Sequence, residues 1–150
     1  MNLLFDTNIL LFYIRKDPHA EELTQLYHPF DDRNISLISI VTQAELLSLS
    51  FQFDWGEHRK GILNRLVNQF LVVPVEAMDL VNIYAEIDAF SQGKMKNNPL
   101  PGGISARNMG KNDLWIAATA HITHSKLITT DNDFDHLDKV YLDLIKVPNR

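Results

Sequence analysis

Short apolar runs alternate along this chain with longer segments whose apolar residues recur at helical spacing. This alternation limits the possible fold more than any other feature. The runs that predict strands are Asn2–Phe5, Ile35–Val41, Leu71–Val73, Lys126–Thr129 and a last one within Val140–Val147. Strands separated by helices favour a parallel sheet with helices on both faces. We therefore predict an α/β fold of three layers (α/β/α), with a central, mostly parallel sheet of four to five strands.

The helical segments have clear start and stop signals. They are expected at Ile9–Ile14, Pro18–Tyr27, Thr42 to about Phe51, Trp55–Phe70, Val75–Ser91 and Asp113–Ser125. The length of 150 residues predicts a single domain over residues 1–150. Because the chain has no cysteine, disulfides and thiolate metal sites are excluded.

Four acidic residues stand where strands end or helices begin. Asp6 follows the first strand, Glu45 lies in the first turn of the helix after the second strand, and Asp113 opens the last long helix. Asp131 follows the strand Lys126–Thr129. In a parallel sheet such positions converge at the carboxyl ends of the strands. Mg²⁺ and Mn²⁺ prefer carboxylate ligands and promote phosphodiester hydrolysis, so the acids predict a metal-dependent catalytic site.

Each acid also has a purely structural interpretation. Asp6 is a possible helix cap, Glu45 stands three residues after Thr42 as in a capping box, and Asp113 favours the positive end of a helix dipole. The Asp131–Asp133 segment is also typical of a turn. A calcium-binding loop is excluded there, because His136 and Leu142 replace the glycine and the glutamate that such a loop needs.

A loop at about 93–111 contains glycines and prolines, no acidic residue and four cations: Lys94, Lys96, Arg107 and Lys111. We predict that these cations contact RNA phosphates, with Arg15 as a weaker second contact; the alternative is a solvated surface loop. The net charge of −5 argues against a broad basic nucleic-acid-binding face. It leaves a nuclease possible, because metal ions neutralise clustered acids locally.

Four motifs together resemble those of PIN-domain nucleases, in the expected order. They are Asp6-Thr7-Asn8, the segment Ser39-Ile40-Val41-Thr42-Gln43-Ala44-Glu45-Leu46, the segment Asn112-Asp113-Leu114-Trp115-Ile116-Ala117-Ala118-Thr119-Ala120, and the segment Leu127-Ile128-Thr129-Thr130-Asp131-Asn132-Asp133-Phe134. The resemblance spans residues 2 to about 134. The chain length further resembles the VapC-type toxins of bacterial toxin–antitoxin pairs.

The resemblance implies a Mg²⁺- or Mn²⁺-dependent endoribonuclease that acts on tRNA, rRNA or mRNA. It implies that the metal ligands are Asp6, Glu45, Asp113 and Asp131, with Asp133 as the alternative to Asp131. Thr7 would support the site and Asn8 would orient Asp6.

The resemblance also implies a cognate antitoxin protein and a homodimer as partners. No apolar run is long enough to span a bilayer and no signal peptide is recognisable, so we expect a cytoplasmic protein without a membrane partner. Two alternatives are a housekeeping RNA-processing nuclease of the same fold and a non-catalytic PIN-like module that binds RNA or protein.

Overall fold

The computed structural model describes residues 1–149 and has a five-stranded sheet at its centre. All neighbouring strands are parallel, in the order β3-β2-β1-β4-β5. The strands are β1 (Asn2–Phe5), β2 (Ile35–Ser39), β3 (Leu71–Val73), β4 (Lys126–Thr129) and β5 (Asp143–Lys146). The predicted α/β fold with a parallel sheet is confirmed.

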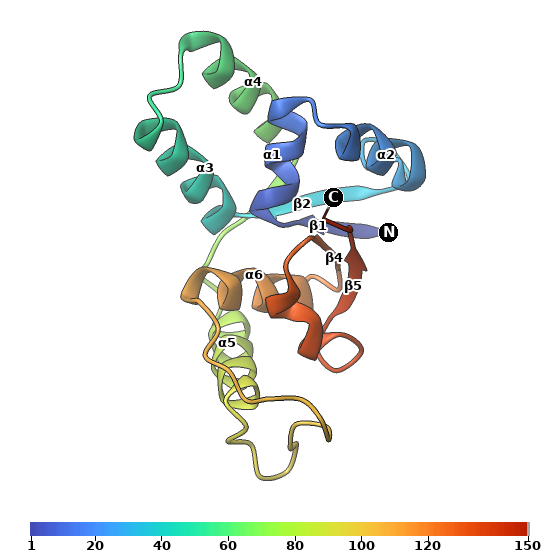
Figure 1. Ribbon diagram of the computed structural model, residues 1–150, viewed down its shortest axis with the longest axis vertical. Helices are drawn as coiled ribbons and strands as arrows, with labels where there is room; N and C mark the ends of the chain where they lie inside the picture. Colours follow the sequence, from blue (N-terminus) through green and yellow to red (C-terminus); the bar gives the residue numbers. More distant parts are fainter. Residues whose placement is uncertain (150) are drawn as a thin grey trace.

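Helices cover both faces of this sheet, as Figure 1 shows. The helices α1, α2, α3 and α4 lie on one side of the sheet, and α5 and α6 lie on the other. Their bounds are α1 (Thr7–Arg15), α2 (Pro18–Tyr27), α3 (Ile40–Gln52), α4 (Glu57–Val67), α5 (Met78–Ser91) and α6 (Lys111–Ile122), with a 3-10 helix η1 (Asn132–Leu137) after β4. Within residues 1–149, no helix has the length and apolar character needed to cross a membrane.

Successive residues of the central strand pack alternately in two separate apolar clusters. Leu3 and Phe5 of β1 pack with residues of α1, α3 and α4, whereas Leu4 between them packs with residues of α5 and α6. All three side chains are fully buried. Side chains alternate between the faces of a strand, so a strand covered on both faces must be apolar throughout. This explains why the strand runs lack alternating polar residues.

The strand order places a topological switch beside β1. The chain passes from β1 to β2 and β3 on one side, and later adds β4 and β5 on the other. Leu4 pairs with both Leu37 of β2 and Leu127 of β4, so the carboxyl ends of three neighbouring strands meet at one edge. Ligands of open α/β sheets bind at this edge, at the switch point.

The second strand is shorter than predicted, and α3 begins earlier. Ser39 ends β2 and caps α3, because its hydroxyl accepts a 3.1 Å hydrogen bond from the backbone N–H of Val41. Serine is a strong N-cap, and this cap moves the helix start ahead of Thr42. The predicted capping box of Thr42 and Glu45 is therefore wrong, since both residues lie inside α3.

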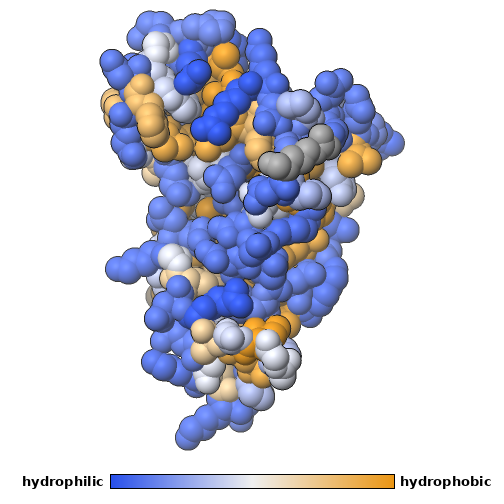
Figure 2. All heavy atoms as spheres, viewed as in Figure 1, coloured by the Kyte–Doolittle hydropathy of each residue, from blue (hydrophilic) through white to orange (hydrophobic). Residues whose placement is uncertain are grey.

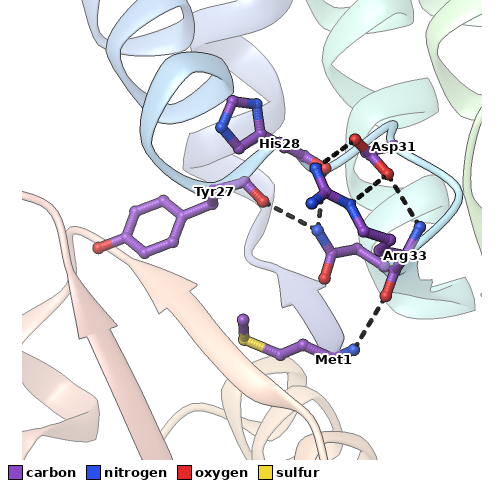
Figure 3. A network of polar contacts seen from close by, with 6 residues as sticks. Met1, Tyr27, His28, Asp31 and Arg33 are labelled. Carbon is purple, nitrogen blue, oxygen red and sulfur yellow. Dashed lines mark hydrogen bonds and ion pairs between the residues drawn. The ribbon is translucent and has the colours of Figure 1, made fainter.

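The amino ends of β1 and β2, opposite the carboxyl ends described above, are held by polar contacts around the turn that follows α2 (Figure 3). Asp31 and Arg33 form an ion pair at 2.8 Å, and the terminal amine of Met1 donates to the carbonyl of Arg33. The Asn34 side chain donates to the carbonyl of Tyr27 at 3.1 Å. These contacts tie the start of β1 to the start of β2 and help to fix the register of the two strands.

The loop at about 93–111, called the basic loop below, connects the end of α5 to the start of α6 and projects away from the sheet in Figure 1. It begins at Gly93, which has a left-handed backbone (φ 71°) that favours glycine. Met95 and Leu100 pack against the apolar cluster below the sheet, and Met109 is buried. The loop is therefore attached to the core at both of its ends.

Candidate active site

The four acids predicted from sequence lie around one hollow at the carboxyl edge of the sheet. The hollow has a volume of about 640 Å³. It is lined by Asp6, Thr7, Asn8, Leu11, Val41, Ala44, Glu45, Ser48, Leu49, Gln52, Asn112, Asp113 and Asp131. These residues come from α1, α3, α6 and the turn after β4, so the hollow unites segments that are far apart in sequence.

Asp6 is the most deeply buried of the acids, with 4% of its surface exposed. Its Oδ1 accepts a 2.7 Å hydrogen bond from the backbone N–H of Thr7, and its Oδ2 accepts one of 2.7 Å from the Thr129 hydroxyl. Burial raises the pKa of Asp6 to about 6; the two hydrogen bonds oppose this rise, and the charges of Asp131 and Glu45 add to it. Asp6 caps α1, as its structural interpretation predicted, and it also faces the hollow.

Glu45 is positioned by the hydroxyl of a residue on another helix. Thr7 of α1 donates a 2.7 Å hydrogen bond to Oε1 of Glu45. The Thr7 hydroxyl also lies 3.2 Å from Oγ1 of Thr42, which is fully buried one turn earlier on α3. The side chain of Thr7 thus orients Glu45 toward the acids of the neighbouring strands.

Asp113 lies in the first turn of α6, whose cap is Gly110. Burial, followed by the negative charges of Asp6, Asp131, Glu45 and Asp133 in that order, raises the pKa of Asp113 to about 7. An uncompensated carboxylate is therefore unfavourable at this position. The main cause is burial, and the convergence of acids that the sequence pattern predicted adds to it.

Three carboxylates approach one another most closely at one end of the hollow. Asp113, Asp131 and Asp133 each have a carboxylate oxygen within 4.8 Å of the others. Asp131 caps η1, because its Oδ1 accepts a 2.8 Å hydrogen bond from the backbone N–H of Asp133. Asp131 is half-buried and lines the hollow, whereas Asp133 is exposed. The geometry therefore favours Asp131 over Asp133 as the fourth acid.

The arrangement suits a hard divalent cation. Its donors are carboxylate oxygens, the preferred ligands of Mg²⁺ and Mn²⁺. Burial and, to a smaller extent, the neighbouring negative charges raise the pKa values of Asp6 and Asp113, and a bound cation would favour their ionised forms. The helices α1, α3 and α6 all begin at the hollow, and the positive ends of their dipoles partly offset the repulsion.

None of the cations predicted to bind RNA is among the residues that line the hollow. Lys111 begins α6, two residues before Asp113, and is exposed. Arg107 is half-buried, and its charge acts on His136 of η1. Exposed Lys94 and Lys96 lie in the basic loop, and exposed Arg15 ends α1.

Sequence reasoning left out several polar residues of the site. Thr129 is fully buried, and its hydroxyl also accepts a 3.0 Å hydrogen bond from the backbone N–H of Asp131. The signal for Thr129 was a polar residue at the end of an apolar strand. Ser48 and Gln52 follow Glu45 at helical spacing, which would have placed them on the same face of α3.

A second polar connection missed by sequence reasoning lies behind the acids. The hydroxyl of Ser91, the last residue of α5, lies 2.7 Å from Nε2 of His136 in η1, and it donates to the sulfur of Met109 at 3.4 Å. The carbonyl of Ser91 accepts a 2.8 Å hydrogen bond from the backbone N–H of Arg107. Burial, together with the charge of Arg107, lowers the pKa of His136 to about 4, so the ring is neutral near pH 7.

The sequence matches one protein-family model, and the structure is similar to several solved structures. The family model described as PIN domain matches residues 3–140. No curated protein matches the sequence. Among solved structures, VapBC2 from Rickettsia felis, bound to a DNA fragment from its promoter, is similar with a TM-score of 0.77 and 21% identity. That match covers 97% of this chain and 98% of the other.

Two further structures have the same fold. VapBC-1 from nontypeable Haemophilus influenzae matches with a TM-score of 0.71 and 24% identity, over 97% of this chain and 98% of the other. FitAcB from Neisseria gonorrhoeae matches with a TM-score of 0.67 and 20% identity, over 97% of each chain. At these identities, the likeness establishes a shared architecture across nearly the whole length of the chains.

Proposed function

The chain belongs to the PIN-domain family, and from that premise we propose that it is a Mg²⁺- or Mn²⁺-dependent endoribonuclease. The observation that carries this proposal is the convergence of Asp113, Asp131 and Asp133, with carboxylate oxygens within 4.8 Å of one another. The hollow beside them also contains Asp6 and Glu45. Five acids at one edge of a sheet would destabilise a protein that did not use them to hold a cation.

Asp6, Glu45, Asp113 and Asp131 are the proposed metal ligands. A bound Mg²⁺ or Mn²⁺ supplies Lewis-acid polarisation of the phosphodiester and lowers the pKa of a water molecule. The protein's own residues keep the ligands in place. Thr129 and the backbone of Thr7 hold the two oxygens of Asp6, and the Thr7 hydroxyl holds Glu45. Asn8 lines the hollow beside Asp6, which agrees with its proposed orienting role.

We further propose that the protein acts in the cytoplasm as the toxin of a toxin–antitoxin pair. The structural relatives named above include VapBC complexes, and the chains match over nearly their full lengths. The substrate would be tRNA, rRNA or mRNA, and an antitoxin encoded next to this protein would inhibit it. A housekeeping RNA-processing nuclease is the alternative, and it requires no neighbouring antitoxin.

Homodimer formation is part of the same proposal. The last turns of α3 carry three exposed apolar residues, Leu47, Phe51 and Phe53, of which Phe51 is 78% exposed. Light-orange atoms mark apolar residues at the surface of this region in Figure 2. Exposed apolar clusters of this kind mark protein–protein contacts. Light scattering of the purified protein should give the mass of a dimer, and Phe51→Ser should shift it toward the monomer.

The central test is cleavage of RNA by the purified protein. We expect cleavage with Mn²⁺ or Mg²⁺, none with a chelator, and none by the Asp6→Asn or Asp113→Asn variants. In cells, induced expression should arrest growth, and the same variants should not. Cleavage that persists in both variants and in chelator would overturn the metal-site proposal. Cleavage of RNA without growth arrest would support the nuclease activity but would favour an RNA-processing enzyme over a toxin.

A further inference from the structure

The hollow beside the acids is much larger than a single hydrated metal ion requires. Its volume of about 640 Å³ lies within the range of sites that hold organic ligands, roughly 300–1,000 Å³. From the acids it continues as a groove between α1 and α3. We call this part the α1–α3 groove and define it by Leu11, Ala44, Ser48, Leu49 and Gln52.

The groove changes character with distance from the acids. Glu45, Ser48, Leu49 and Gln52 lie on one face of α3, because they are spaced by three, four and seven residues. The seven residues from Glu45 to Gln52 correspond to about 10 Å along the helix axis. Leu11 of α1 and Leu49 of α3 supply an apolar middle section. The polar end, at Gln52, is therefore roughly one nucleotide away from the acids.

The amide of Gln52 is held in a defined orientation. Its Nε2 donates a 2.8 Å hydrogen bond to the hydroxyl of Ser48, one turn earlier on α3. One amide N–H and the carbonyl oxygen Oε1 stay available beside each other. A donor next to an acceptor matches the hydrogen-bonding edges of nucleobases. Unstacked bases of single-stranded RNA are recognised in this way, with apolar contacts to the face of the base.

Two exposed cations stand at the end of α1 that is remote from the acids. Arg15 follows Leu11 by four residues and ends α1, so it lies on the same helix face farther from the acids. Arg15 and the neighbouring Lys16 are exposed. The acids thus lie at one end of the groove, apolar walls lie in its middle and the amide of Gln52 lies at its other end, while α1 carries its cations at the end remote from the acids. This arrangement suits a scissile phosphate at the acids and the base of an adjacent nucleotide in the groove.

We propose that the α1–α3 groove is a base-binding subsite for one unstacked nucleotide next to the cleaved bond. Gln52 contacts the edge of the base, Leu11 and Leu49 contact its face, and Ser48 fixes the amide. The subsite rests on the proposed ribonuclease function and assigns part of its substrate selectivity to α3. The bases of a duplex are stacked and paired, so the proposed subsite requires the cleaved segment to be single-stranded at this position.

The test compares Gln52→Ala with Gln43→Ala. Gln43 lies on the same helix, but its side chain faces away from the groove, toward α4. Each protein cleaves a panel of short single-stranded RNAs in Mn²⁺, with the four bases varied at each position beside the cut. We expect Gln52→Ala to raise KM by about fivefold to tenfold and to flatten the base preference at one position. Its kcat should stay within about twofold of the parent value. Ser48→Ala should weaken the same preference partially.

Binding of Mn²⁺ by the same proteins separates this inference from the function on which it rests. We expect Gln52→Ala to bind Mn²⁺ as the parent does, because Gln52 holds no metal ligand. If the parent cleaves RNA and Gln52→Ala matches Gln43→Ala in KM and base preference, the subsite is wrong and the ribonuclease stands. If the parent binds Mn²⁺ but cleaves no RNA, the ribonuclease proposal fails and the subsite fails with it.

Discussion

The hydroxyl of Ser91 lies 2.7 Å from Nε2 of His136 and joins the two segments that carry the closest acids. His136 belongs to η1, which Asp131 caps, and the sulfur of Met109 accepts from Ser91 just before α6 begins. Asp113 follows in the first turn of α6. Ser91 touches none of the carboxylates. Its hydroxyl links the side chains of His136 and Met109, and its carbonyl accepts from the backbone N–H of Arg107, so we expect Ser91 to act as a positioning residue for the acids.

Ser91→Ala should weaken Mn²⁺ binding without removing a ligand. Residues that orient metal ligands from behind typically change metal affinity tenfold or more, so we expect a loss of about tenfold in calorimetric titration. Ser50→Ala is the matched control, because Ser50 is also buried near a helix end and bonds only to the carbonyl of Leu47. Equal Mn²⁺ affinities of the two variants would show that Ser91 has only a local role.

Thr129→Val should destabilise the metal-free protein and raise the pKa of Asp6 further. The substitution keeps the shape of the side chain but removes a hydrogen bond that favours the charged form of a buried carboxylate. We expect a decrease in the free energy of unfolding of about 2 kcal/mol, measured in urea. Thr119→Val controls for a buried threonine, since Thr119 bonds only to a carbonyl within α6. A similar loss in both variants would contradict a special role for Thr129.

The metal-free protein should become less stable as the pH rises from about 4 to about 7. Folding raises the pKa of Asp6 from 3.8 to about 6 and that of Asp113 from 3.8 to about 7. The folded state therefore binds more protons than the unfolded state between these values, and its stability falls as pH rises through them. Thermal unfolding at several pH values measures the slope. Saturating Mn²⁺ should reduce it, because metal binding favours the ionised carboxylates.

Asp113→Asn should separate stability from activity. The substitution removes a charge that four neighbouring acids oppose, so the metal-free variant should unfold at a higher temperature than the parent at about pH 8. It should also lose Mn²⁺-dependent RNA cleavage, because a proposed ligand is lost. An equal or lower unfolding temperature would mean that the repulsion at Asp113 is already relieved without metal.

Reversing the charges of Arg107 and Lys111 tests the role of the basic loop. If both contact RNA phosphates, the double substitution to glutamate should weaken RNA binding and reduce the salt slope by about 0.7 for each lost contact. Lys60→Glu combined with Arg65→Glu, both on α4, is the control, because it changes the net charge by the same amount. Unchanged RNA affinity and salt slope would support a solvated loop without a binding role.

The sequence predicted the fold because its strands are apolar on both faces and its helices carry apolar stripes. It predicted the convergence of Asp6, Glu45, Asp113 and Asp131 because parallel strands end at a common edge. It missed the start of α3, where the capping strength of Ser39 outweighs the β-branched residues that follow it. Local patterns were sufficient for the elements and for the acids, since each signal lies within a few residues of the element that it specifies.

Tertiary contacts were beyond the reach of such patterns. The bond between Thr7 and Glu45 joins α1 to α3, and the pair Ser91 and His136 joins residues 45 positions apart. Neither has a local signature, because each depends on how two packed elements approach one another. The basic loop illustrates the same limit: its composition indicated a surface loop, and no local pattern indicated that Met95, Leu100 and Met109 pack in the core.

The pairing of β1 with β4 makes the acid site a late product of translation. Asp6 is made among the first residues, but Thr129, which bonds to its carboxylate, follows 123 positions later. A nascent chain on the ribosome therefore has no assembled site until its last third is free to pack against β1. Parallel strands so distant in sequence also pair slowly. The complete site therefore forms only after Thr129 has left the ribosome and β4 has paired with β1.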